Sequence, residues 1–219
     1  MAVYAGPDIV ENGLVLHLDA ANPRSYPGTG TGWFDLSGNN NNGTLTNGPS
    51  YNQDQLGNIV FDGTNDEVIA TNIGLTNYTF EFFVKATGDS LAGANRYNTL
   101  IGYDGSRRLL YHTNGTLLAQ VGTGNIFSTT TAPRNNWNHI VFSYNAPNTT
   151  ATWYINGTNA GSTSGTAQGT WTSTIYIGSY NSNNYWMNGN ISSVKIYNRA
   201  LVAEEIQQNF NALRGRFGI

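Results

Sequence analysis

The chain lacks cysteine, has few charges and contains no long apolar run, and each shortage removes a class of function. Without cysteine there is no disulfide, no thiol nucleophile and no cysteine-ligated zinc. Charged residues are only 11% of the 219 residues, the net charge is -3 and no basic run occurs, so the sequence predicts no nucleic-acid partner. No stretch approaches the ~18 apolar residues of a membrane span, so no membrane partner is predicted either.

In place of charged residues, the chain is rich in amide, hydroxyl and aromatic side chains. Aromatic residues make up 12% of the chain, with thirteen Tyr and five Trp, beside many Asn, Thr, Ser and Gly. Rings of this kind fill sandwich cores, and they also suit sugar faces and protein interfaces, where they bury area at low entropic cost. The opening segment Met1–Gly13 has neither the positive stretch nor the apolar stretch of a signal peptide.

Apolar residues alternate with polar ones in a period of two, which is typical of half-buried strands. The runs are at 13–19, 57–63, 67–70, 78–86, 98–103, 108–113, 116–122, 137–145, 150–157, 173–180 and 189–199, and the pair Asn156-Gly157 is expected to turn into another strand. One segment, 200–213, has helical spacing instead. The fold class predicted is all-β, an antiparallel jelly-roll sandwich with one short C-terminal helix, in a single domain over residues 1–219 with its core at about 13–213.

Six motifs occur in order along the chain. They are GLVLHLDA, DLSGNNNNGTLTNGP, IVFDGTNDEV, YTFEFFVKA, WNHIVFSYN with TWYINGT, and GNISSVKIYNRALVAEEI. In this order they resemble the laminin G-like jelly-roll branch of the concanavalin A-like lectin/glucanase superfamily. The resemblance implies two packed sheets of curved strands, adhesion or carbohydrate recognition more often than catalysis, and in some members calcium on the rim. The stretch AGPDIVENGLVLHLDAANPRSYPG also resembles stand-alone structural proteins of tailed bacteriophages, particularly those of marine cyanobacteria.

The carboxylates do not form a hydrolytic pair in the sequence. Glucanases of this superfamily cut sugars with two carboxylates on one strand face, and retaining hydrolysis needs them about 5–5.5 Å apart. The strand that corresponds to theirs, YTFEFFVKA, carries Glu81 alone. Asp66 and Glu67 are adjacent and point to opposite faces of a strand, and Glu204 and Glu205 lie in the helical segment. The protein is therefore predicted not to be an enzyme, with no catalytic residues.

Four consecutive asparagines, 39–42, follow an aspartate in FDLSGNNNNGTLTNG. One hypothesis is a calcium site, because calcium takes six to eight oxygens from carboxylates, amides and backbone. Its candidate ligands are Asp35, Asn39, Asn41, Asp62 and Asp66. The alternative is that the asparagines form turns through left-handed backbone and side-chain-to-backbone bonds. Against calcium, Ser192 and Ser193 stand where many relatives have an acidic pair.

A second loop, SYNSNNYWMNG, combines rings with amides, which is the chemistry of a sugar-binding site. The candidate glycan-binding residues are Trp171, Tyr180, Asn181, Asn183, Asn184, Tyr185 and Trp186. The alternative is a rim loop whose Trp186 closes the end of the sandwich.

These features lead to two hypotheses for function. The first is a phage virion structural protein, namely a capsid decoration, head fibre or tail component, with an adhesive role toward host-surface glycans. Its partners would be other virion proteins or copies of itself, and it would assemble in the host cytoplasm without a signal peptide. The second is an extracellular carbohydrate-binding module, secreted or on a cell surface. The basic, apolar tail, residues 213–219, is expected either to dock into a neighbour or to fray.

Overall fold

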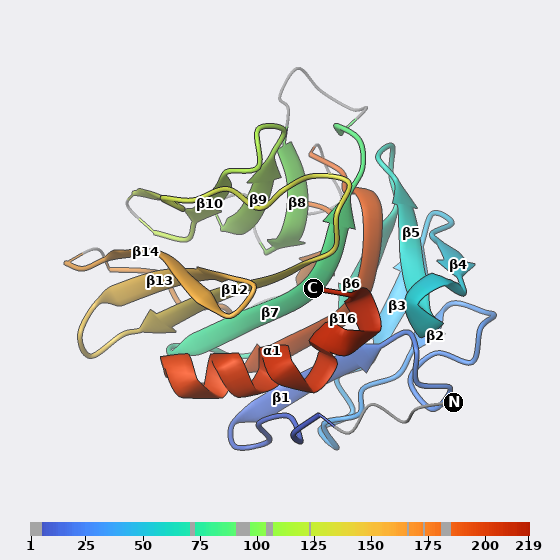
Figure 1. Cartoon of the computed structure of the whole chain (residues 1–219), viewed down its shortest axis with the longest axis horizontal. Helices are drawn as coiled ribbons and strands as arrows, with labels where there is room; N and C mark the ends of the chain where they lie inside the picture. Colours follow the sequence, from blue (N-terminus) through green and yellow to red (C-terminus); the bar gives the residue numbers. More distant parts are fainter. Residues whose placement is uncertain are drawn as a thin grey trace.

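Two antiparallel sheets pack face to face (Figure 1). The structure is a computed structural model that describes residues 6–70, 73–90, 97–103, 107–122, 124–165, 167–172, 174–180 and 185–219. Sheet A has the order β14 (Thr158–Thr163), β13 (Thr150–Ile155), β12 (Asn138–Asn145), β7 (Tyr78–Ala86), β16 (Asn188–Tyr197), β5 (Asn58–Asp62) and β4 (Ser50–Asn52). The strand β1 (Leu14–Asp19) also belongs to sheet A and pairs with β16.

Sheet B lies opposite sheet A. Its order is β11 (Asn125–Phe127), β10 (Leu117–Gln120), β9 (Arg108–His112), β8 (Tyr97–Gly102), β15 (Ile175–Ile177), β6 (Glu67–Ala70), β3 (Gly43–Thr46) and β2 (Gly32–Trp33). A short 3-10 turn, η1 (Asp54–Leu56), and one α-helix, α1 (Ala203–Phe217), complete the described elements. The predicted fold class, an antiparallel sandwich with one C-terminal helix, is confirmed.

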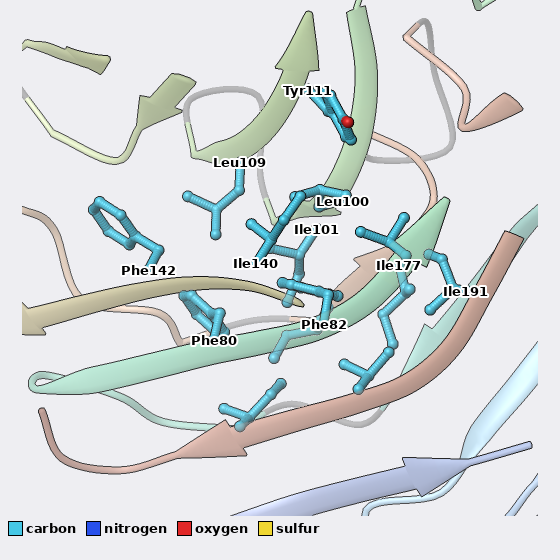
Figure 2. Close-up of a cluster of buried hydrophobic side chains, with 14 of the residues drawn as sticks. Phe80, Phe82, Leu100, Ile101, Leu109, Tyr111, Ile140, Phe142, Ile177 and Ile191 are labelled. Atoms are coloured by element: carbon cyan, nitrogen blue, oxygen red, sulfur yellow. The ribbon is translucent and has the colours of Figure 1, made fainter. Parts of the chain in front are cut away.

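The core lies between the sheets, where alternate side chains from both meet. Figure 2 shows part of it, with Phe80, Phe82 and Ile140 from sheet A and Leu100, Ile101, Leu109 and Ile177 from sheet B. Burying such side chains stabilises the fold by roughly 1.5–3 kcal/mol each. Because strand side chains alternate, the residues between them face outward from the sandwich.

The two outward faces are covered differently. Along β7 every residue except Lys85 is buried, so both faces of this strand are enclosed. The outer side of sheet A is covered by α1 (Figure 1), where Phe210 and Phe217 pack against Phe83 and Trp137. No helix of the described residues covers sheet B in this way, and none of them is long and apolar enough to cross a membrane.

The C-terminal helix differs from its prediction in bounds and in anchoring. It begins at Ala203 and ends at Phe217, three and four residues later than expected. Val202 offers no side-chain oxygen as a cap, but its N–H donates to Glu205 at 3.1 Å, and Arg199 donates two further bonds to the same carboxylate. The tail neither frays nor projects, since the Phe217 ring stacks on Phe83 at 4.5 Å.

Four strands were not predicted. They are β2, β3, β4 and β11, which are two to four residues long. Their sequences GW, GTLT, SYN and NIF are too short to display a period of two. They form because neighbouring strands offer free edges, as β6 does to β3 and β5 does to β4.

Candidate functional site

The outer face of sheet B gathers polar and aromatic side chains from neighbouring strands. In β9, Leu109 and Tyr111 are in the core, so Arg108 and His112 face outward. The strand register then places Tyr97 of β8 opposite His112, and Gln120 of β10 opposite Arg108. The register brings together residues that lie 12 or more positions apart in the sequence.

A cluster of rings surrounds the Arg108 guanidinium. Its carbon lies 4.1 Å from the centre of the Tyr180 ring and 4.8 Å from that of Tyr185. The two tyrosine rings are 6.2 Å apart, and Tyr185 lies 6.1 Å from Tyr97. The His112 ring contacts Tyr97 edge-on at 4.7 Å. We call these five residues the tyrosine–arginine cluster. All five are half-buried, so each presents part of its side chain to solvent.

Backbone contacts hold the two tyrosines of the rim loop over β8. The Thr99 N–H donates to the Tyr185 carbonyl at 2.9 Å, beside an irregularity in the register between β8 and β9. Gly102 lets the loop cross, because a Cβ there would lie 2.5 Å from the Ser179 carbonyl oxygen. Tyr185 itself has φ of 58°. A bulky residue in this left-handed region costs roughly 1–3 kcal/mol, and such strain is concentrated at functional positions.

A pocket of about 250 Å³ lies next to the cluster. It is lined by Tyr97, His112, Asn114, Thr116, Leu118 and Phe127. The Phe127 ring is 51% exposed, and Asn114 is also exposed. The pocket therefore offers both an apolar ring and hydrogen-bonding groups, the combination expected of a small-ligand site.

A larger pocket, of about 490 Å³, lies at the other face, beside the C-terminus. Its walls include Lys85, Asn136, Trp137 and Phe217. This pocket contains an indole and several amides, but Trp137 is only 7% and Phe217 only 6% exposed. Their rings pack on each other at 4.9 Å, and little of either residue is exposed. Without an open ring face this pocket is the weaker candidate for a sugar.

The structure separates the predicted glycan-binding residues. Tyr180 and Tyr185 are brought together at the cluster. Trp171 is fully buried and contacts Phe80 at 4.7 Å, so its indole belongs to the core and offers no platform to a ligand. Trp186 is also buried. The predicted partners Asn181, Asn183 and Asn184 lie outside the described residues. Sequence reasoning missed Tyr97, Arg108 and His112, since no local motif marks them.

The asparagine run is tied to the start of β1. Asp35 accepts four hydrogen bonds, from the backbone N–H groups of His17, Ser37 and Asn41 and from the Ser37 hydroxyl. The Asn39 amide donates to the Leu14 carbonyl at 3.2 Å, and the Asn41 amide to the Val15 carbonyl at 2.7 Å. Asn40 adopts φ of 59°. These contacts are those of a turn, the second of the two readings of this loop.

The other candidate calcium ligands lie in a separate place. Asp66 Oδ2 accepts from the Asp62 N–H at 2.9 Å, and Asp66 is buried, which raises its pKa. Asp62 pairs with residue 188 of β16, whereas His17, which Asp35 contacts, pairs with residue 195. Seven residues of strand span about 23 Å. No group of three or more acidic or histidine side chains that could hold a metal occurs in the described part of the chain. Calcium binding itself stays a prediction.

Glu81, the lone carboxylate on the strand that corresponds to the catalytic one, lies beneath α1. Lys195 Nζ and Asn209 Nδ2 each donate to it at 2.7 Å, and His139 Nε2 lies 3.2 Å from it. The Glu81 side chain is 0% exposed. A carboxylate enclosed by three partners under a helix cannot reach a sugar, so its role is structural.

The sequence between residues 62 and 207 matches the family model described as the concanavalin A-like lectin/glucanases superfamily. The chain therefore belongs to this superfamily, as its two sheets and their order indicate. No curated protein sequence matched the chain. The motifs quoted above predicted this membership; the resemblance to phage structural proteins is not tested by these comparisons.

Solved structures share the fold at low sequence identity. The binding domain of Paraclostridial Mosquitocidal Protein 1 aligns with a TM-score of 0.69 at 20% identity, over 92% of this chain and 52% of its own length. The ligand-binding domain of botulinum neurotoxin serotype D, in complex with N-acetylneuraminic acid, aligns with a TM-score of 0.69 at 16% identity, over 92% of this chain and 51% of its own length. Domain 4 of AbnA, an extracellular arabinanase from Geobacillus stearothermophilus, in complex with arabinotriose, aligns with a TM-score of 0.68 at 18% identity, over 92% of this chain and 100% of its own length. The chain thus spans about half the length of the toxin domains, and these similarities establish the fold alone.

Proposed function

We propose that this protein is a non-enzymatic glycan-binding domain and that the tyrosine–arginine cluster with its neighbouring pocket is the sugar-binding face. The observation that carries the proposal is the packing of Tyr180 and Tyr185 on Arg108, with Tyr97 against Tyr185, on the face of sheet B that α1 leaves open. Ring faces pack on the C–H groups of a sugar, while amides and the guanidinium donate to its hydroxyls.

Two of the structures that share the fold support this proposal, since their names record bound sugars, arabinotriose in one and N-acetylneuraminic acid in the other. The arabinanase domain is also matched over its full length, which shows that a sandwich of this size serves as a separate sugar-binding unit in that enzyme. Because identity is below 20% in both, the residues that would bind a sugar here must be argued from this chain alone.

The test is glycan binding by the purified protein and three variants. Tyr185→Ala removes a ring from the centre of the cluster and should weaken binding about tenfold or more, since a stacked ring contributes roughly 1–3 kcal/mol. Tyr185→Phe keeps the ring and should retain most of the affinity. Phe34→Ala removes another exposed ring, 46% exposed and adjacent to β2 at the opposite edge of sheet B, and should change nothing. Equal binding by Tyr185→Ala and the unmodified protein would contradict the proposed site.

We propose further that the domain acts on a virion, as a capsid decoration, head fibre or tail component, beside other virion proteins or copies of itself. This rests on the resemblance of residues 5–28 to phage structural proteins. Immunogold electron microscopy of phage particles with antibody to this protein tests it. Label on capsids would indicate a decoration or head fibre, and label on tails an adhesin. Unlabelled particles would favour the alternative, an extracellular carbohydrate-binding module.

A further inference from the structure

Arg108 differs from three other arginines of the structure in having no acidic partner among the described residues. Arg134 contacts Asp89, Arg199 contacts Glu205, and Arg216 contacts Asp19, all within 2.6–2.8 Å. Arg108 instead donates through Nε to Gln120 Oε1 at 2.5 Å. Within the described residues its terminal nitrogens, Nη1 and Nη2, donate no hydrogen bond to the chain and are not among the buried polar atoms. A half-buried positive charge in the middle of the proposed binding face therefore has no counter-charge in the part of the chain that the structure describes.

From this geometry we infer that the site takes a sugar that carries a carboxylate, and that Arg108 binds the carboxylate through its two terminal nitrogens. The inference rests on the proposed function and names its ligand class. A guanidinium matches a carboxylate in a planar, two-bond contact. Such a contact orients the sugar while its ring lies against the tyrosines.

The guanidinium is fixed before any ligand arrives. The Nε bond to Gln120 is itself supported, because the Gln120 amide donates to Asn125 Oδ1 at 2.9 Å. The Tyr180 and Tyr185 rings hold the guanidinium carbon at 4.1 and 4.8 Å. A donor held in this way loses little rotamer freedom on binding, which favours affinity. The same contacts keep water from part of the group, so the attraction to an anion is stronger than at an open surface.

The charge of this surface region also favours an anion. The side chains that surround Arg108 in the described residues are Tyr180, Tyr185 and Gln120, none of which is acidic. A neutral sugar would leave the guanidinium partly desolvated with no compensating charge. A sulfated sugar would also supply negative charge and can accept two bonds from a guanidinium, but its oxygens are far less basic than those of a carboxylate and accept weaker hydrogen bonds.

The experiment is a binding screen on matched pairs of immobilised glycans. The pairs are oligogalacturonates and their methyl esters, sialylated and desialylated lactose, and sulfated and unsulfated dextran. Each is probed with the unmodified protein and with Arg108→Gln, Arg108→Lys and the control Arg24→Gln. Arg24 is exposed and lies outside sheet B. Because it is also an arginine, its replacement by glutamine makes the same change in net charge away from the cluster.

We expect a carboxylate-bearing member to bind at least tenfold more tightly than its neutral counterpart, because hydrogen bonds to charged groups discriminate by about this much or more. Arg108→Gln should abolish the preference, so that the acidic and neutral members of each pair bind with similar affinity. Arg108→Lys should keep part of the preference, since it keeps the charge without the planar fork. Arg24→Gln should keep all of it.

Other outcomes separate the inference from the proposed function. Equal binding of acidic and neutral members, or an acid preference that survives Arg108→Gln, would overturn the carboxylate inference and leave the glycan-binding proposal standing. A preference for the sulfated dextran alone would likewise overturn the carboxylate inference, because the recognised group would then be a sulfate. If no glycan binds to the unmodified protein, the proposed function fails and this inference fails with it.

Discussion

Lys195 Nζ donates a 2.7 Å hydrogen bond to Glu81 Oε1, and the two side chains are 1% and 0% exposed. This buried pair connects three parts of the chain. Asn209 of α1 donates to the other Glu81 oxygen, and it accepts from the Val10 N–H at 2.8 Å. The pair therefore fastens both α1 and the segment before β1 to the outer face of sheet A.

Removing one member of this pair should destabilise the fold strongly. Lys195→Met leaves Glu81 buried with a partner lost, and breaking such a pair typically costs about 3–5 kcal/mol. The measurement is the free energy of unfolding from urea titration. Asp89→Asn is the control, because Asp89 is 44% exposed in its pair with Arg134 and should cost less than about 1 kcal/mol. Similar costs for the two variants would show that burial adds nothing to the Glu81–Lys195 pair.

Stability should fall as the pH falls from 6.5 to 4. Burial, and after it the charge of Lys195, lowers the pKa of His17 from 6.5 to about 4, although the carboxylates of Asp19, Glu81 and Asp35 act in the opposite direction. Above pH 6.5 both folded and unfolded His17 are neutral. Between the two values only the unfolded state takes up the proton, so stability is lost, by up to about 3 kcal/mol.

Unfolding free energies at pH 7, 5.5 and 4 measure this loss, and His17→Gln should flatten the dependence. Burial also lowers the pKa of His139, so part of the slope should remain in the variant. Below about pH 4.5 a further loss is expected from Glu81. Burial raises its pKa, but Lys195 and His139 outweigh burial and hold the pKa below its usual 4.5. An identical slope in the unmodified protein and His17→Gln would exclude His17 as its source.

Asp35 should stabilise the asparagine loop through its own hydrogen bonds. Asp35→Ala leaves the donors at His17, Ser37 and Asn41 without their acceptor, and we expect a cost of about 1.5–3 kcal/mol. Asp54→Ala, at an exposed carboxylate, is the control and should cost little.

Thermal melts, which measure the cost of Asp35→Ala, also decide between the two readings of the loop. Because the Asp35 oxygens already accept bonds from the chain, we expect the unmodified protein to melt at the same temperature in calcium chloride and in EDTA. A rise in the melting temperature with calcium that EDTA reverses and Asp35→Ala abolishes would instead support the calcium site.

Trp171 should act on stability, because its ring lies in the core. Besides Phe80, the indole contacts Tyr103 at 5.4 Å and Tyr78 at 6.0 Å. Trp171→Ala would leave a large cavity, and such truncations typically cost about 3–5 kcal/mol. Calorimetry should show a much lower melting temperature, whereas Phe34→Ala, at an exposed ring, should melt as the unmodified protein does. A Trp171→Ala protein of normal stability that has lost glycan binding would contradict this placement.

Arg216 should stabilise the docking of the C-terminal helix onto the sheet. Its guanidinium donates to the Gln55 and Gly57 carbonyls at 2.6 and 2.8 Å, to Asp19 at 2.8 Å and to the Ser192 hydroxyl. Lysine cannot form this set of bonds, so Arg216→Lys should cost about 2 kcal/mol in urea unfolding. Arg214→Lys changes an exposed residue two positions away and is the matched control. Equal stability of the two variants would refute the anchoring role.

The long strands and the fold class could be predicted because the alternation that defines a strand is local. In β7, for example, Phe80, Phe82 and Val84 fall on one face at every second position, whatever the rest of the chain does. The family motifs have the same local character. The short strands could not be predicted, since a two-residue strand such as β2 is defined by its neighbour β3.

The residue types of the candidate site could partly be predicted from the sequence. Which individual residues belong to it was decided by the tertiary structure. Trp171 and Tyr185 lie in similar stretches of rings, hydroxyls and amides, yet the first faces the core and the second lies beside Arg108. No local pattern predicts that difference, because it depends on which strand each segment crosses. Strand register joined Tyr97 and His112, and α1 packs on sheet A, whereas no helix of the described residues covers sheet B. The sequence by itself thus determined which types of side chain the protein has, because composition and local alternation are read directly from it. The pairing of distant strands decided which of those side chains become neighbours.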